Sequence, residues 1–190
     1  MKKENKAALL KALRSQIMAS PGRVTLEEVE IVEHTLNSGR DLGEGDGDKK
    51  PDVDYRIVIR FDETDERIDT VIFDAMAETM PDSVDMAEAA PVNPCRRGDE
   101  AREVEGMYPE SMLLIARSKN RRPAIKFSEN EPFTTGKALE DRLLEKPLTT
   151  DRFTANVDVK LDWYDFESDD GETHCGWSAR VLSLTLDTPF

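Results

Sequence analysis

The alternation of apolar and polar residues is strongest near the carboxyl end of the chain. From Phe153 to Trp163 the odd positions are Phe, Ala, Val, Val, Leu and Trp, and the even positions are Thr, Asn, Asp, Lys and Asp. A period of two is typical of a strand with one buried face. A second apolar run, Trp177–Leu186, follows an acidic turn that contains glycine. Together they predict a β-hairpin, with a bulge where the apolar Val181 and Leu182 are adjacent.

Shorter strand patterns occur in the middle of the chain. The segment Tyr55–Phe61 alternates and places Arg56 and Arg60 together on its exposed face. There the two arginines can bind phosphate or pair with neighbouring carboxylates, and the sequence leaves both roles open. Met112–Ala116 is an apolar strand, and a strand pattern resumes at 125–127.

Helical spacing predicts three helices. In 3–18, leucines and an isoleucine recur at helical spacing, and we expect this helix to dock against the body of the protein or against a partner subunit. Residues 62–80 form an amphipathic pattern that Asp62 or Thr64 can cap. Lys137–Lys146 is a short helix bounded by glycine and proline.

Three other segments are less regular. Thr25 and Glu28 fit a capping box, which predicts a helix over 26–37, although the apolar residues at 29 and 31 also fit a short strand. Residues 37–54 are rich in Gly and Asp and predict a flexible acidic loop, and Pro81–Gly106 is loop-like.

Composition limits the classes of protein that this chain can belong to. It has 190 residues and a formal net charge of −14, and no stretch is apolar enough to span a membrane. Only Cys95 and Cys175 are present, so no disulfide framework is implied and we expect an intracellular protein. We find no phosphate-cradling glycine loop, no nucleophile elbow and no metal ligands at motif spacing. We therefore predict no enzyme activity, no cofactor and no metal.

Basic residues concentrate in one turn of this acidic chain. Residues 111–128 contain five basic residues and no acidic ones. A groove for a polyanion needs such local segregation of charge, and the alternative is a solvated basic turn. The N-terminal segment is also basic, so the segregation is not unique to this turn.

The order of the predicted elements is strand, helix, strand, basic turn, strand, short helix and long hairpin. Short strands with inserted helices favour a five-stranded OB-type barrel. Four stretches then resemble the phage-encoded OB-fold single-stranded-DNA-binding proteins of viral DNA replication. They are SPGRV (20–24), PVNPCRRGDE (91–100), ARSKNRRP (116–123) and FTANVDVKLDWYDFESDDG (153–171). Many members of that family end in a long acidic tail closed by an aromatic residue. Here 182–190 ends in Phe190 but contains a single acid, Asp187, so the resemblance does not extend to recruitment of partners by such a tail.

The resemblance implies a mainly β, five-stranded OB-fold barrel over 17–190. The helical extension over 1–16, predicted from helical spacing, is an addition to the usual pattern of the family. It implies a protein that coats and protects single-stranded DNA during viral replication or recombination, with little sequence preference, in the host cytoplasm. Replication or recombination proteins, and a second copy bound through the N-terminal helix, are the expected protein partners, and no membrane is expected. The alternative is an acidic adaptor or inhibitor that binds a protein and no nucleic acid.

The expected DNA contacts are of two kinds. Basic side chains would hold phosphates, and aromatic rings would stack on exposed bases. Tyr164 is favoured as a stacking ring because alternation places Trp163 on the core face. The predicted contact residues are Arg56, Arg60, Tyr108, Arg117, Lys119, Arg121, Arg122, Lys126, Phe127, Lys160, Tyr164 and Trp177.

Overall fold

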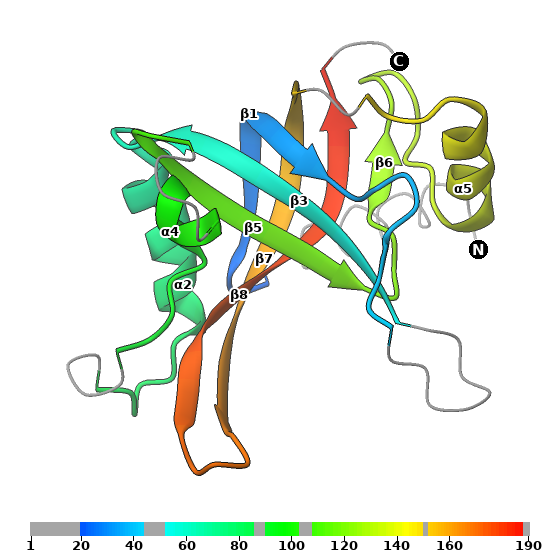
Figure 1. The fold of residues 1–190 in the computed structure, drawn as a ribbon. Coiled ribbons are helices and arrows are strands. Elements are labelled where there is room, and N and C mark those ends of the chain that lie inside the picture. Colours follow the sequence, from blue (N-terminus) through cyan, green and yellow to red (C-terminus); the bar gives the residue numbers. More distant parts are fainter. Residues whose placement is uncertain (1–19, 44–51, 86–89, 103–107, 150–151, 188–190) are drawn as a thin grey trace, which may run out of the picture.

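The structure is a computed structural model that describes residues 20–43, 52–85, 90–102, 108–149 and 152–187 (Figure 1). The predicted N-terminal helix and residues 44–51 of the Gly/Asp-rich loop lie outside these residues. The strands are β1 (Arg23–His34), β2 (Arg40–Asp41), β3 (Val53–Asp62), β4 (Cys95–Arg97), β5 (Ser111–Lys119), β6 (Ala124–Lys126), β7 (Phe153–Glu167) and β8 (Thr173–Leu186). The helices are the π-helical η1 (Ile68–Ile72), α2 (Phe73–Thr79), α4 (Gly98–Arg102) and α5 (Gly136–Glu145).

The strand pairings of the described residues close a ring. β1 pairs with β3 and with β7, β7 pairs with β8, β8 pairs with β5, and β5 pairs back with β3. The β5–β8 pair is parallel and the others are antiparallel. β2, β4 and β6 add short pairings to this ring. The predicted mainly β fold is confirmed, and five strands form the ring.

The core lies inside the ring, where alternation predicted it. Ala155, Val157, Val159 and Leu161 on β7 are fully buried, as are Ile57 and Ile59 on β3. Burying each large aliphatic side chain contributes roughly 1.5–3 kcal/mol. The predicted bulge is also present, because Asp158 and Val159 pair with Ser183 and Val181, which leaves Leu182 as an extra residue on β8.

The helix predicted over 26–37 is wrong, because this segment is β1. Val29 and Ile31 are buried in the core at a spacing of two residues. The backbone of the segment pairs with β3 on one side and with β7 on the other. Tertiary pairing on both edges outweighs the local preference for a capping box.

Three other segments are more ordered, or shorter, than predicted. The helix expected from Asp62 begins only at Ile68, because Asp62 is the last residue of β3. In the turn between them, the Asp65 carboxylate accepts hydrogen bonds from the backbone N–H and the guanidinium of Arg67. The loop-like stretch 81–106 contains β4 and α4, and the acidic loop 37–54 contains β2 and the start of β3.

Two helices and one hairpin flank the ring (Figure 1). α2 and α5 lie on opposite sides of the strands, and the β7–β8 hairpin extends beyond the body of the molecule. Trp177 fixes α2 to the hairpin, because its indole Nε1 donates to the Met76 carbonyl oxygen at 2.9 Å and to Thr79 Oγ1 at 3.2 Å. No helix among the described residues is long and apolar enough to cross a membrane.

Candidate nucleic-acid interface

One basic residue from each strand of the ring lies in a continuous row, which we call the basic belt. Going round the ring, Arg23 on β1 pairs in register with Lys160 on β7, and Lys160 pairs with Arg180 on β8. Arg180 pairs with Arg117 on β5, and Arg117 with Arg56 on β3. Each side chain points outward, because neighbouring positions along each strand fill the core. A row of like charges at cross-strand spacing is unfavourable by itself, so it needs counter-charges or a ligand.

Carboxylates of the same chain supply part of that counter-charge. Asp158 pairs with Arg23 at 3.0 Å, and Glu33 lies 3.9 Å from Arg56. Asp162 contacts both Lys160, at 2.5 Å, and Arg180, at 2.7 Å. Arg117 is exposed and forms no ion pair with any residue that the structure describes.

Three adjoining hollows follow the belt, and we call them together the basic groove. The first, of about 590 Å³, includes Arg96, Arg117, Lys119, Asp162, Tyr164 and Arg180 in its lining. The second, of about 610 Å³, shares Lys119 and Arg180 with the first and adds Arg23, Arg121 and Arg122. The third, of about 550 Å³, shares Arg121 and Arg122 with the second and adds Tyr55, Lys137 and Glu140. The shared lining residues show that neighbouring hollows adjoin one another.

Several groove cations are held in place by nearby oxygens. Lys119 contacts Asp52 at 2.5 Å, and its hydrogen bond is the main reason why the pKa of Asp52 is lowered. Arg122 donates to the Asn37 carbonyl oxygen at 3.0 Å and lies over the Tyr55 ring at 5.0 Å. Arg96, by contrast, is exposed and forms no ion pair with a described residue. The groove therefore contains cations that are fixed by contacts within the chain, and others that form no ion pair with a described residue.

A row of aromatic rings continues from the groove along the projecting hairpin. Tyr164 and Phe166 share the outward face of β7, with ring centroids 6.0 Å apart. Phe166 stacks on His174 of β8 at 5.3 Å with an interplanar angle of 27°. Phe166 is 55% exposed, so its ring is open to solvent. Flat, exposed faces next to a basic groove suit the stacking of unpaired bases.

Comparison with known proteins identifies the fold. No protein-family model matches the sequence, and no curated protein matches it. The single-stranded DNA-binding protein from bacteriophage Enc34, solved in complex with ssDNA, is 14% identical, with 89% of each chain covered and a TM-score of 0.57. The single-stranded DNA-binding protein gp2.5 of bacteriophage T7 is 11% identical, with 88% of this chain and 92% of that chain covered and a TM-score of 0.51. The chain shares the fold of these phage proteins. The fold predicted from the four sequence stretches is thereby confirmed.

The structure brings together most of the predicted basic residues. Arg117, Lys119, Arg121 and Arg122, all from the basic turn, line the groove. Tyr164 lines its first hollow, and Arg56 and Lys160 belong to the belt.

Five predicted contact residues lie elsewhere or are covered. Phe127 is 0% exposed, so its ring offers no face to a base. Trp177 belongs to the lining of the first hollow, but it is only 5% exposed and its indole is bonded to α2, so we leave both rings out of the interface. Arg60 pairs with Glu30 at 3.3 Å, and the Tyr108 hydroxyl donates to Glu33 at 3.1 Å. Lys126, on β6, is absent from the groove lining. Of the two roles open to Arg56 and Arg60, pairing with carboxylates is the one that the structure shows.

Sequence reasoning missed residues that reach the groove from other strands. Arg23, Arg96, Lys137 and Arg180 line it, yet they are separated by long stretches of chain. Arg180 and Phe166 had a usable signal, because alternation along the hairpin already places both on its outward face. Arg96 had no signal from alternation, since β4 is only three residues long, but it lies in PVNPCRRGDE (91–100), one of the four stretches that resemble the family.

Proposed function

We propose that this protein binds single-stranded DNA along the basic groove, and that it coats and protects that DNA during viral replication or recombination. The observation that carries the proposal is the basic belt, which gathers one cation from each ring strand in a chain of net charge −14. A field that is positive along one path and negative elsewhere guides a polyanion to that path.

In this proposal the two kinds of residue have separate roles. Phosphates lie along the groove cations, Arg117 above all, because it is exposed and unpaired among the described residues. Bases splay outward onto Tyr164 and Phe166, where stacking contributes roughly 1–3 kcal/mol per base without reading sequence. Duplex DNA cannot offer its bases to these rings, so single strands are preferred.

The position of the groove agrees with general rules for OB folds. Such folds bind oligonucleotides on the face of their second and third strands and on the loops that flank it. Here these strands are β3 and β5, which carry Arg56 and Arg117, and the hairpin β7–β8 carries the aromatic row. The Enc34 protein of the same fold was itself solved with ssDNA, which further supports the proposal.

The test is fluorescence anisotropy with a labelled single-stranded oligonucleotide at a series of salt concentrations, with duplex DNA and RNA as competitors. We expect binding that weakens with salt, with a slope of about 0.7 per neutralised phosphate. Arg96→Gln should weaken binding and flatten the slope, because Arg96 lines the groove.

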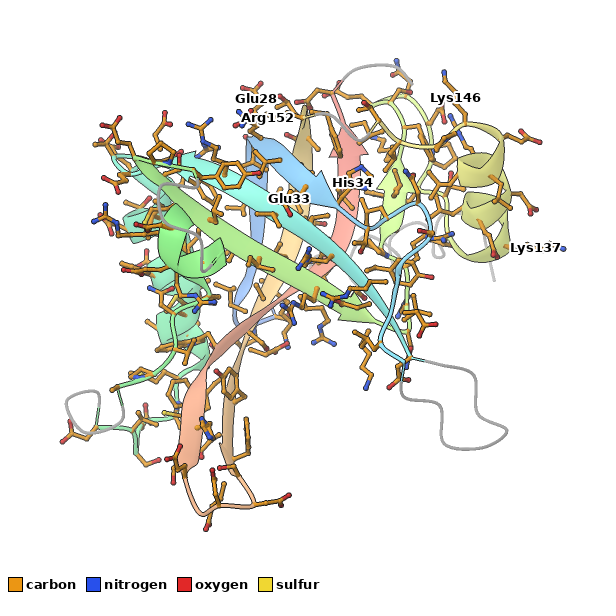
Figure 2. All side chains as sticks on the ribbon, in the orientation of Figure 1. Glu28, Glu33, His34, Lys137, Lys146 and Arg152 are labelled. Carbon is orange, nitrogen blue, oxygen red and sulfur yellow. The ribbon has the colours of Figure 1, made fainter. Side chains whose placement is uncertain are left out.

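Arg97→Gln is the matched control. It removes the same charge one residue further along β4, but Arg97 pairs with Glu63 at 3.2 Å and does not line the groove. A second matched pair is Lys137→Gln and Lys146→Gln, since these lysines project from opposite ends of α5 and only Lys137 lines the groove (Figure 2). Absence of binding at low salt would overturn the proposal and favour a protein-binding adaptor. Equal losses of DNA affinity within each pair would show that the interface lies outside the basic groove.

A further inference from the structure

Of the two carboxylates that line the basic groove, Asp162 and Glu140, only Asp162 is paired with cations of the basic belt among the described residues. Asp162 is on the outward face of β7 and lines the first hollow together with Arg117, Lys119 and Tyr164. Its Oδ1 lies 2.5 Å from Lys160 Nζ, and its Oδ2 lies 2.7 Å from an Arg180 guanidinium nitrogen. A single carboxylate therefore forms ion pairs with two neighbouring cations of the belt.

The surroundings of Asp162 differ from those of Asp158, the other aspartate that pairs with a cation of the belt. Asp158 accepts hydrogen bonds from Arg23 at 3.0 Å, from the Thr25 hydroxyl at 2.6 Å and from the Ser183 hydroxyl at 2.8 Å, so it ties three elements together. Among the described residues, the donors to the Asp162 side chain are the two belt cations alone. Its side chain is 33% exposed, so the fold does not depend on burying it.

A carboxylate oxygen and a phosphate oxygen compete for the same donors. Both are anionic acceptors that form charge-assisted hydrogen bonds with ammonium and guanidinium groups. A phosphate that reaches Lys160 and Arg180 must therefore displace Asp162 or lie beside its negative charge. Exposed ion pairs of this kind are worth little, so displacement is feasible, but it reduces the net gain.

We propose that Asp162 is an internal competitor for the DNA phosphate, which limits the affinity of the basic groove and speeds release of the strand. This inference rests on the proposed function, since it concerns the same groove. It explains why the belt is not self-repelling in the unbound protein, and it gives a coating protein a means to exchange quickly along a strand that other proteins must reach.

The test compares Asp162→Asn with Asp165→Asn. Both remove one negative charge from β7, but Asp165 is three residues further along, on the other face of the strand, exposed and outside the groove lining. We expect Asp162→Asn to bind single-stranded DNA several-fold more tightly at low salt, with a slope steeper by about one or two units because two cations become available. Its dissociation rate, measured by stopped flow with unlabelled competitor, should fall, whereas Asp165→Asn should follow the wild type.

The outcomes separate this inference from the proposed function. If the wild type binds and Asp162→Asn binds more weakly, Asp162 positions its two cations, and the competitor role is wrong while the function stands. If the two variants gain affinity equally, the effect is one of overall charge and the inference is again wrong. If the wild type and Asp162→Asn both fail to bind at low salt, the function and the inference fall together. Melting curves check that both variants are folded.

Discussion

Two residues illustrate how a single position is constrained by what surrounds it. Gly176 of β8 has a φ of +153°, and a Cβ atom there would lie 2.5 Å from the Val92 carbonyl oxygen. This close approach allows two backbone hydrogen bonds between Val92 and β8. The Val92 N–H donates to the Cys175 carbonyl oxygen at 2.9 Å, and the Trp177 N–H donates to the Val92 carbonyl oxygen at 3.0 Å. The contact holds the segment before Arg96 against the groove.

Gly176→Ala should therefore lower the free energy of unfolding by about 1–3 kcal/mol, through backbone strain and lost hydrogen bonds, and it should weaken DNA binding. The control is Gly171→Ala, at a φ of +82° in the same hairpin, where the nearest atom to a new Cβ is 3.9 Å away. Denaturant melts and binding isotherms for both variants decide between the two sites. Equal stability losses would mean that backbone conformation alone, and not contact with Val92, sets the cost.

Cys95 illustrates a buried ionisable group. Burial raises the pKa of the Cys95 thiol to about 12 from an ordinary 9.0, because the thiolate loses its hydration. As the pH rises, the Cys95 thiol ionises in the unfolded chain before it ionises in the folded protein. The contribution of the neutral thiol to the free energy of unfolding is therefore fully present below pH 9.0 and declines as the pH rises towards 12. The loss at pH 10 is about 1.4 kcal/mol.

Cys95→Ala should remove this part of the pH dependence. The difference in unfolding free energy between wild type and variant, measured from pH 8 to pH 10, cancels the titration of lysines and tyrosines common to both. It should shrink by about 1.4 kcal/mol over that range. A constant difference would show that the thiol ionises equally in the folded and unfolded states.

At the scale of elements, the β7–β8 hairpin serves packing on one face and the proposed recognition on the other. Trp163 packs against the core and meets Trp177 edge-on, with ring centroids 4.7 Å apart. The next residue, Tyr164, points into the basic groove. The alternation of a strand thus places the two aromatic neighbours in different environments.

Trp163→Ala should cost about 3 kcal/mol of stability, the lower end of the range for a truncated buried aromatic residue, because its ring is only partly covered. Tyr164→Ala should leave the melting temperature nearly unchanged and cost roughly 1–3 kcal/mol of single-strand affinity. Melting curves and anisotropy on both variants test this. Unfolding by Tyr164→Ala, with a folded but non-binding Trp163→Ala, would mean that the two roles are exchanged.

At the scale of the whole molecule, charge is distributed unevenly. The chain has a net charge of −14, yet the charged residues that line the described basic groove are cations except for Asp162 and Glu140. Ring closure produces this arrangement, because it places β5 beside both β3 and β8 and so joins Arg56, Arg117 and Arg180. Net charge alone argued against a nucleic-acid partner, whereas the local arrangement favours one.

The sequence by itself determined the features that depend on local periodicity. The hairpin with its bulge at Leu182, the core face of β7 and the helix α5 all follow from spacing within one segment. It also placed the basic turn, because those residues are neighbours in the chain. Its position beside the basic turn also made Phe127 a candidate stacking ring, but the packing around the ring, which the sequence does not show, leaves it fully buried.

Tertiary structure alone decided the rest. Whether 26–37 is a helix or a strand depended on partners at both edges, which local preference does not contain. The basic belt depends on the registers of four strand pairs, and a shift of one residue in any of them would turn a cation away from the row. Residues far apart in the chain become neighbours only when the ring closes, so no local pattern in the sequence shows that Arg23, Arg96 and Arg180 line one groove.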